Sequence, residues 1–408
     1  MEAAIADAHR HEWAFVVAAT IRVTGDIDVA EECVQEAYSK ALSAWPTSGI
    51  PAKPGAWLTT VARRKAIDHL RRLSTHQRIL PAIVDANEDD SIPDVDGSLI
   101  GDDRLRLIFT CCHPALSPEA QVALTLRLLC GLSTSEVARA FLVSESTMAA
   151  RLTRAKKKIA TSHIPYQVPN AADLPSRVDA VLSVVHLVFT TGHTAPTGAD
   201  LMRRDLVERS LDLCRMLRVL LPDDAGVTGL LALIVLTDAR RTTRTGPQGE
   251  LLLLSQQDRD QWDRAAIDEG VRLVRVSLSE RPAGRFALMA AIATLHAQAP
   301  TWEATDWSEI VALYDLLLAA WPSPVVALNR AVAVGFAVGP EAGLSVLESL
   351  RVDPHLSSYS YYESARADFL RRLGRFDEAR SAYQESLEHC ANDVERAFLR
   401  ERLTELPG

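Results

Sequence analysis

The sequence lacks several features that would assign it to a common class of protein. Its six cysteines show no framework spacing for disulfides, and no apolar run approaches the roughly 18 residues of a membrane span. The first residues, MEAAIADAHRHE, have neither the basic start nor the apolar core of a signal peptide. We therefore expect a cytoplasmic protein with reduced thiols and no membrane contact.

Signatures of catalysis are also missing. The chain has no phosphate-binding loop, nucleophile elbow or metal-binding constellation. Cys111, Cys112 and His113 are adjacent, but neighbouring cysteines do not readily share a tetrahedral zinc site, and no second ligand pair lies nearby. We interpret these cysteines as small buried thiols. We expect no enzymatic activity, and therefore no catalytic residue, metal or cofactor.

The composition is that of a folded helical protein. Hydrophobic residues make up 48% of the 408 residues and aromatic residues only 6%, and almost no segment has the alternating pattern of a strand. The formal net charge of -9 argues against a protein coated in positive charge for non-specific nucleic-acid binding. The sequence thus predicts an all-α fold, divided by length into two or three domains.

Residues 131–158 predict a helix-turn-helix. Ser133 and Glu136 have the spacing of a capping box, and Ser144 is suited to cap a second helix that begins near Glu145. In that second helix, apolar and polar residues separate onto two sides, and its exit is basic throughout. The apolar side has Met148, Leu152, Ala155 and Ile159, and the other has Ser146, Thr147, Ala150, Arg151 and Arg154, followed by Lys156, Lys157 and Lys158. This pattern favours DNA binding, and the alternative is a helical hairpin with a solvated basic face.

The first 75 residues predict three or four helices with opposite charge on two of them. One helix, near residues 26–45, has an acidic face formed by Asp28, Glu31, Glu32, Gln35 and Glu36. A loop over residues 46–55, with three prolines and two glycines, separates it from a helix with a basic face. That basic face contains Arg63, Arg64, Lys65, Arg71 and Arg72. Acidic helix faces are commonly only solvated, so this pattern alone does not establish a partner.

These motifs, in this order, resemble the group 4, extracytoplasmic-function branch of the sigma-70 family over residues 12–159. The segments that carry the resemblance read AEECVQEA, WLTTVARRKAIDHLRR and RLTRAKKK. The resemblance implies that the partner is core RNA polymerase, with its β′ and β subunits. It implies that the acidic helix docks on the β′ subunit. It implies that the basic helix grips the −10 element and that residues 146–158 contact the −35 element of promoter DNA.

Within this resemblance, individual side chains have different expected roles. Arg151 and Arg154 are expected to read bases, Ser146, Thr147 and Ala150 to meet base edges, and Lys156, Lys157 and Lys158 to contact phosphates. The loop before the basic helix lies where the family captures a flipped base. For Trp57 at the start of that helix, a core aromatic that anchors the helix is favoured over a DNA contact.

We divide the chain into four parts. Residues 1–75 form sigma region 2, residues 76–103 an acidic linker, residues 104–163 sigma region 4, and residues 164–408 a C-terminal helical extension. Within the extension, residues 323–395 show two copies of a tetratricopeptide-like pattern with a period of about 34 residues. Such repeats stack into solenoids that bind protein or peptide partners, and the alternative is a helical bundle with two chance repeats.

Several segments of the extension look like landmarks of a known subgroup: DARR at 238–241, QQDRDQWD at 256–263, LHA at 295–297, TDW at 305–307 and LYD at 313–315. With these segments the extension resembles a recognised subgroup of extracytoplasmic-function sigma factors in which a fused helical domain replaces a separate anti-sigma factor. Its polar residues Asp238, Arg240, Asp258, Arg259, Trp262 and His296 lie in helices expected to be buried. Buried ion pairs explain them better than an enzyme site. The segment FTTGH at residues 189–193 departs from the subgroup, which puts any role of that loop in doubt.

The function that follows is a sigma factor that directs core RNA polymerase to promoters and is regulated by its own extension. The alternative is a stand-alone helix-turn-helix regulator with a repeat-based protein-binding domain.

Overall fold

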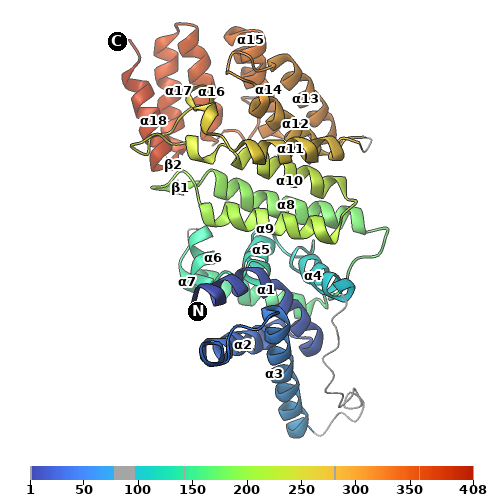
Figure 1. The fold of residues 1–408 in the computed structure, drawn as a ribbon. Coiled ribbons are helices and arrows are strands. Elements are labelled where there is room, and N and C mark those ends of the chain that lie inside the picture. The colour runs from blue at the N-terminus through green and yellow to red at the C-terminus, as the bar shows by residue number, and fades with distance from the viewer. Residues whose placement is uncertain (1, 78–96, 142, 280–281, 358, 408) are drawn as a thin grey trace. The chain divides into compact units, whose positions relative to one another are not determined.

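The computed structural model describes residues 2–77, 97–141, 143–279, 282–357 and 359–407. Helices dominate this part of the chain, and its two strands have two residues each, which confirms the all-α prediction (Figure 1). The chain divides into two compact units, Met1–Val185 and His186–Gly408, and we describe each by itself.

Unit 1 begins with three packed helices, α1 (Glu2–Thr24), α2 (Ile27–Ser48) and α3 (Pro54–Gln77). Asp26 caps α2, since its carboxylate accepts hydrogen bonds from the backbone amides of Asp28 and Val29. The three helices bury one another's apolar sides, and Val16, Trp45 and Leu58 at their interface are fully buried. The predicted helices of region 2 are therefore present.

The loop after the acidic helix is shorter than predicted. Pro46 lies inside α2 and Pro54 starts α3, so that only residues 49–53 connect the two helices. Proline is tolerated here because its fixed φ suits the first helical position, and because near a helix end it removes only one backbone hydrogen bond. The last carbonyls of α2 are satisfied locally, since the hydroxyls of Thr47 and Ser48 donate to Ala44 and the Gly49 amide donates to Trp45.

The second half of unit 1 contains α4 (Gly97–Cys111), α5 (Pro118–Leu124), the π-helical turn η1 (Thr125–Leu129), α6 (Thr134–Phe141) and α7 (Glu145–Thr161). Residues 78–96 of the predicted linker lie outside the described residues. The end of that predicted linker, residues 97–103, is helical in α4. Asp103 there is buried and forms ion pairs with Arg22 at 3.3 Å and Arg106 at 3.1 Å.

Residues beyond the predicted end of region 4 also pack within unit 1. The Tyr166 hydroxyl donates to the Ala18 carbonyl of α1 at 2.9 Å, and Arg177 of α8 (Leu174–His193) donates to the Phe109 carbonyl of α4. The division between the compact units falls inside α8, between residues 185 and 186. The segment just after residue 163 therefore has a structural role in holding α1 and α4.

Unit 2 is organised around α10 (Ala225–Asp238), whose residues 227–236 are all buried. It packs against α9 (Arg204–Leu220), α11 (Arg264–Ser277) and α12 (Arg285–Gln298). Gly229 allows α12 to come close, because a Cβ at this position would lie 2.7 Å from the backbone nitrogen of Ala287. Short 3₁₀ turns, η2 (Arg241–Thr243), η3 (Leu254–Gln256) and η4 (Arg259–Gln261), connect α10 to α11.

The rest of unit 2 is a series of helix pairs. It contains α13 (Trp307–Ala320), α14 (Pro324–Ala337), α15 (Pro340–Ser349), α16 (Ser360–Arg372), α17 (Phe376–His389) and α18 (Asp393–Thr404). The pairs α14–α15 and α16–α17 each pack together, as the tetratricopeptide-like pattern predicts. Phe369 of α16 fits against Gly335 and Gly343, where added Cβ atoms would lie 2.3 Å and 2.8 Å from its ring.

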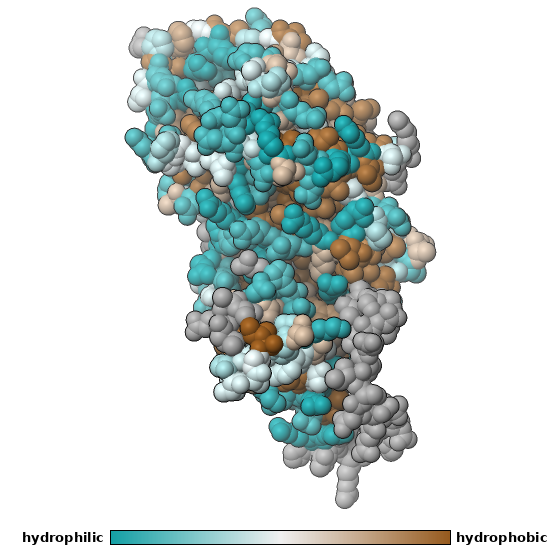
Figure 2. Space-filling model, in the orientation of Figure 1, coloured by the Kyte–Doolittle hydropathy of each residue, from teal (hydrophilic) through white to brown (hydrophobic). Residues whose placement is uncertain are grey.

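The start of unit 2 is tied to its C-terminal part by two very short strands. β1 (Thr197–Gly198) pairs in parallel with β2 (Ala391–Asn392), and the buried Asn392 amide donates to the carbonyls of Ala195 and Asp200. In the face shown in Figure 2, hydrophilic residues predominate and hydrophobic residues form scattered patches. Within the described residues, no helix is both long enough and apolar enough to cross a membrane.

Candidate nucleic-acid and partner interface

The helix-turn-helix forms as the sequence predicts. The Glu136 amide donates to the Ser133 hydroxyl at 3.2 Å and the Ser133 amide donates to the Glu136 carboxylate at 2.7 Å, which completes the capping box of α6. Ser144 caps α7, since its hydroxyl accepts a hydrogen bond from the Thr147 amide at 3.2 Å. These caps fix where both helices start, and so they fix which side of α7 faces outward.

The two sides of α7 are sorted as predicted. The side that packs is buried and consists of Met148, Leu152, Ala155 and Ile159. The opposite side is exposed at Ser146, Thr147, Ala150, Arg154, Lys157 and Lys158. Arg151 is half-buried because its guanidinium lies over the Phe141 ring, 5.3 Å from the centroid. This side of α7 therefore presents hydroxyls and a methyl group near its N-terminus and positive charge toward its C-terminus.

Lys156 differs from its neighbours, because it is engaged inside unit 1. Its Nζ lies 2.7 Å from the Asp28 carboxylate and 2.5 Å from the Glu31 carboxylate, and its side chain is only 15% exposed. Burial acts to lower the pKa of Lys156, but the two carboxylates outweigh it and the pKa is raised. The predicted DNA-contacting lysine is thus bound to the predicted polymerase-contacting helix in this conformation.

The acidic face of α2 is correspondingly divided. Asp28, Glu32, Gln35 and Glu36 are exposed, whereas Glu31 is buried and also pairs with Arg127 of η1 at 2.8 Å. Arg127 in turn donates to the Leu132 carbonyl at 2.8 Å, next to the helix-turn-helix. Arg127 and Lys156 thus meet at the Glu31 carboxylate, and Lys156 also pairs with Asp28, so both cations hold region 4 against α2.

Arg127 is a residue that the sequence analysis missed. It is the one charge in the apolar run LTLRLLC, which is a signal that a partner for it lies inside the fold. Next to it, a cavity of about 420 Å³ opens between α1, α2 and the start of α6, lined by His9, Trp13, Tyr38 and Gly131 among others. The contact between regions 2 and 4 is therefore incompletely packed at this edge.

The basic side of α3 is largely open. Arg63, Arg64, Lys65, Arg71 and Arg72 are all exposed. Lys65 pairs with Glu36 at 2.7 Å, and this hydrogen bond raises the pKa of Lys65, but both side chains remain about half exposed. Pairs of this kind in water contribute little to stability and exchange readily. The face can therefore meet a partner without unfolding any core.

Trp57 lies at the start of α3, as predicted, and is half-buried. Its ring meets the fully buried Trp45 of α2 edge to face, with centroids 5.6 Å apart. Edge-to-face packing of this kind stabilises a helix junction. The geometry agrees with the core-anchor interpretation.

The cysteine cluster agrees with the buried-thiol interpretation. All six cysteines are buried, and burial is the main cause that raises the pKa of Cys112 to about 12. Its sulfur lies 3.6 Å from the Thr125 hydroxyl. Among the described residues, no group of three or more His, Cys, Asp or Glu side chains has the arrangement of a metal site.

The buried polar residues of the extension are only in part the ion pairs that we predicted. Asp238 pairs with Arg241 at 3.2 Å, and Asp258 caps η4. Arg259, however, donates to the backbone carbonyls of His296 and Ala299 and not to a carboxylate. The departing segment FTTGH ends α8, where the Arg203 amide donates to the Gly192 carbonyl at 2.7 Å.

Family models match the two modules separately. Residues 10–75 match sigma-70 region 2, and residues 106–159 match sigma-70 region 4, so both parts of a sigma-70-type factor are present in the expected order. Residues 177–278 match a family of unknown function, DUF6596, which covers the first part of the extension.

Similar proteins define the branch of this class. The chain is 41% identical to a functionally uncharacterized protein of Rhizobium meliloti (strain 1021), over 95% of this chain and 92% of that one. It is 34% identical to the probable ECF RNA polymerase sigma factor SigI of Mycobacterium tuberculosis, over 40% of this chain and 56% of SigI. It is 30% identical to the ECF RNA polymerase sigma factor SigK of Mycobacterium bovis, over 39% of this chain and 84% of SigK. The chain belongs to the extracytoplasmic-function sigma factor family and has a C-terminal extension beyond the shared regions.

Proposed function

We propose that this protein binds core RNA polymerase, through its β′ and β subunits, and directs it to promoters with −10 and −35 elements. The supporting observation is that two separate helices, α3 and α7, each present an exposed basic side within segments that match sigma-70 regions 2 and 4. Two DNA-contacting sides on two modules suit a factor that spans two promoter elements. This role places the protein in the cytoplasm.

At the −35 element, α7 enters the major groove with its N-terminal turns. Ser146, Thr147 and Ala150 meet base edges and thymine methyl groups, while Arg151 and Arg154 pair with guanine. Lys157 and Lys158 contact phosphates, which hold the helix in register without reading sequence. All of these side chains except the half-buried Arg151 are exposed in unit 1, which supports this assignment.

At the −10 element, α3 holds the strand that is separated. Its middle and later turns present five exposed cations suited to a single-stranded backbone, Arg63, Arg64, Lys65, Arg71 and Arg72. Trp57 contributes chiefly by anchoring the start of α3 against Trp45. The separated DNA strand, with its bases unstacked, then lies along a helix that is already rigid. This rigidity lowers the entropic cost of holding the strand.

Polymerase binding uses the acidic side of α2. Asp28, Glu32, Gln35 and Glu36 are exposed, and Glu31 becomes accessible when its contacts with Arg127 and Lys156 open. The same opening releases Lys156 to contact phosphates. We therefore propose that polymerase and DNA binding favour a more open arrangement of regions 2 and 4.

The extension regulates these activities, and its tetratricopeptide-like helix pairs provide a surface for a protein or peptide partner. A full-length chain and a chain ending at Val185 should therefore differ in promoter-dependent transcription with core enzyme. Equal activity of the two chains would remove the regulatory role and leave the promoter role intact.

The polymerase role is tested by mixing the purified protein with core RNA polymerase and measuring complex formation. We expect saturable binding, weakened about tenfold or more by Glu32→Lys, because Glu32 is exposed on the proposed docking side of α2. Glu388→Lys, an exposed position on α17, is the matched control and should bind normally. Absence of any complex with the unaltered chain would refute the proposal.

A further inference from the structure

Unit 2 contains a cavity of about 310 Å³ between α10, α12, α13 and α14. This volume lies at the lower end of the range of small-molecule sites, which are mostly apolar with a few polar groups. Most of the cavity wall consists of aliphatic side chains, such as Leu233, Met289 and Ile292. The cavity therefore has the size and the apolar character to enclose a compact organic molecule.

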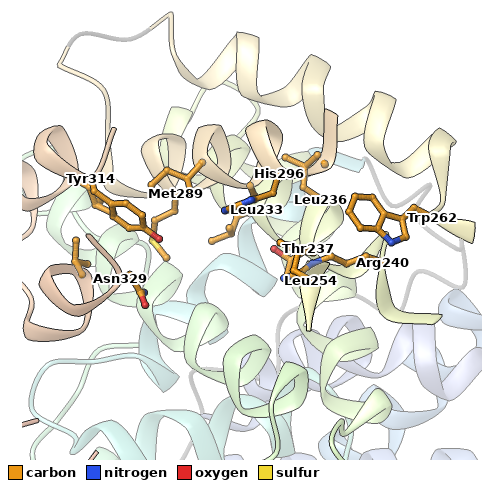
Figure 3. A pocket seen from close by; sticks show the side chains of 15 residues that line it. Leu233, Leu236, Thr237, Arg240, Leu254, Trp262, Met289, His296, Tyr314 and Asn329 are labelled. Carbon is orange, nitrogen blue, oxygen red and sulfur yellow. The ribbon is translucent and has the colours of Figure 1, made fainter. Parts of the chain in front are cut away.

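The polar groups of the cavity occupy different positions along it (Figure 3). Arg240 and Thr237 lie toward the Trp262 end, Tyr314 and Asn329 lie at the opposite end, and His296 lies between them. Asn329 is exposed, whereas Arg240 is half-buried. The cavity thus has a cation at one end and neutral polar groups at the other.

The guanidinium of Arg240 has no compensating anion. Across the described residues, its side chain has no hydrogen bond or ion pair, and the nearby carboxylate of Asp238 is paired with Arg241. Burial and then repulsion by Arg259 lower the pKa of Arg240 to about 10, so it remains charged at neutral pH. Arg240 is half-buried, and a cation that has lost much of its water without gaining an opposite charge is costly.

The surrounding cations make this imbalance larger. Arg244 donates to the His193 carbonyl and the Thr194 hydroxyl, and Arg259 donates to two backbone carbonyls. The carboxylates of Glu395 and Asp238 act on Arg244, and that of Glu303 acts on Arg259. Among the groups that the structure describes, no carboxylate acts in this way on Arg240, whose charge is opposed only by burial and by Arg259.

His296 adds a buried atom without a hydrogen-bond partner to the same cavity. Its Nδ1 is buried and has no hydrogen-bond partner within the part of the chain that the structure describes. Burial is the main cause that lowers the pKa of His296 to about 4, and the charges of Arg240 and Arg259 add to it. The ring is therefore neutral at neutral pH, and its unpartnered nitrogen can form one hydrogen bond with a ligand. Trp262, whose indole nitrogen donates to Thr243, contributes only its ring to the wall.

We propose that this cavity is a binding site for a small organic anion with an apolar body, whose carboxylate or phosphate group pairs with Arg240 and approaches His296. The apolar body lies along Leu233, Met289 and Ile292. The planar guanidinium recognises either type of oxyanion through paired, charge-assisted hydrogen bonds. This site is independent of the proposed promoter function, since it concerns ligand binding by unit 2 alone.

The test uses the full-length protein and ligand-observed NMR titrations with hexanoate, benzoate and phenyl phosphate, and benzamide as the neutral counterpart of benzoate. We expect at least one of the three anions to bind saturably and benzamide to bind at least tenfold more weakly than benzoate or not at all. Carboxylate probes and the phosphate ester distinguish the two kinds of oxyanion. Arg240→Gln should weaken binding at least tenfold.

Two further variants separate ligand binding from folding. Arg275→Gln changes an exposed arginine of α11 and should leave binding unchanged. Ala293→Leu fills the cavity while keeping Arg240, and should abolish binding even if the Arg240 variant does not fold. The proposal is overturned if none of the three anions binds, or if binding persists in both the Arg240 and the Ala293 variants.

Discussion

Consecutive basic residues of α7 have different surroundings and therefore different expected roles. Lys157 and Lys158 extend into solvent, Arg151 lies over Phe141, and Lys156 is held by Asp28 and Glu31. A side chain that stacks on a ring is restricted in its rotamers, which favours precise base recognition. Mobile lysines act instead as diffuse positive charge near phosphates.

Arg151→Ala should reduce use of the −35 sequence, because the guanine contact that we propose for Arg151 is lost and each such pair discriminates by about 1 to 3 kcal/mol. Lys157→Ala should weaken binding to all promoters alike and lower the slope of log affinity against log salt by about 1. Both effects are measured with holoenzyme on cognate and −35-altered promoter DNA over a range of salt concentrations. Identical behaviour of the two variants would contradict this division of roles.

Buried histidines should make the stability of unit 2 depend on pH. Burial is the main cause that lowers the pKa of His186 and of His296 to about 4, from the ordinary value of 6.5. Between these values the unfolded chain binds protons that the folded chain does not, so the free energy of unfolding decreases as pH falls from about 6.5 to about 4. A shift of this size corresponds to about 3 kcal/mol for each residue.

His186→Leu should remove the part of this pH dependence that comes from His186. The expected result is a flatter plot of the free energy of urea unfolding against pH between about 6.5 and 4. His389→Gln, at an exposed position in α17, is the control and should follow the unaltered protein. A plot for the leucine variant as steep as that of the unaltered protein would exclude His186 as a source.

At the scale of elements, Lys156 of α7 meets two carboxylates of α2, those of Asp28 and Glu31. Glu31 is buried and also pairs with Arg127, so it joins the acidic helix of region 2 to both η1 and α7 of region 4. Tyr166 and Asp103 add further links between α1 and the elements that follow it. Region 4 is therefore held by the packing of α4 and η1 against α1 and by a few polar contacts beside an incompletely packed edge.

Lys156→Ala should loosen this contact and lower the stability of unit 1 by about 2 kcal/mol, because Glu31 stays buried with one partner fewer. If opening accompanies polymerase binding, the same variant should bind core enzyme more tightly than the unaltered chain. Unfolding and core-binding titrations measure the two effects, and Lys158→Ala, which is exposed, provides the control. Loss of stability with unchanged or weaker core binding would argue against the opening step.

At the scale of the whole chain, the compact units do not coincide with the modules of the sequence. The segment after α7 packs on α1 and α4 through Tyr166 and Arg177, and both residues follow the predicted end of region 4 at residue 163. Unit 1 reaches Val185. Truncations chosen from motifs alone would therefore remove part of its packing.

A chain that ends at Ile164 should be less stable than one that ends at Val185. The shorter chain lacks the Tyr166 and Arg177 hydrogen bonds, each of which typically contributes about 1 kcal/mol, and leaves the Phe109 carbonyl without its donor. Thermal unfolding of the two purified chains should show a lower Tm for the shorter chain. Tyr166→Phe in the longer chain should account for part of the difference, and equal Tm values would contradict the expectation.

Local sequence patterns were sufficient for the elements and for much of the candidate site. The caps at Ser133 and Ser144 and the sorted sides of α7 depend on residues within four positions of each other, so helical geometry determines them. The sorted charge of α2 and α3 is likewise visible in the sequence, because it needs only the helical period. The loop between them was misjudged because proline is tolerated at helix ends as well as in loops.

Only the tertiary structure decided which charges are paired and which are not. Lys156 and Lys157 are neighbours in the sequence, but only Lys156 meets Asp28 and Glu31, which lie more than a hundred positions away. Arg240 and Arg241 differ in the same way, since Asp238 pairs with one and leaves the other facing a cavity. Such partners depend on how distant helices pack, because the free energy of a charge depends on its burial and on every group nearby, and not on its position in the sequence.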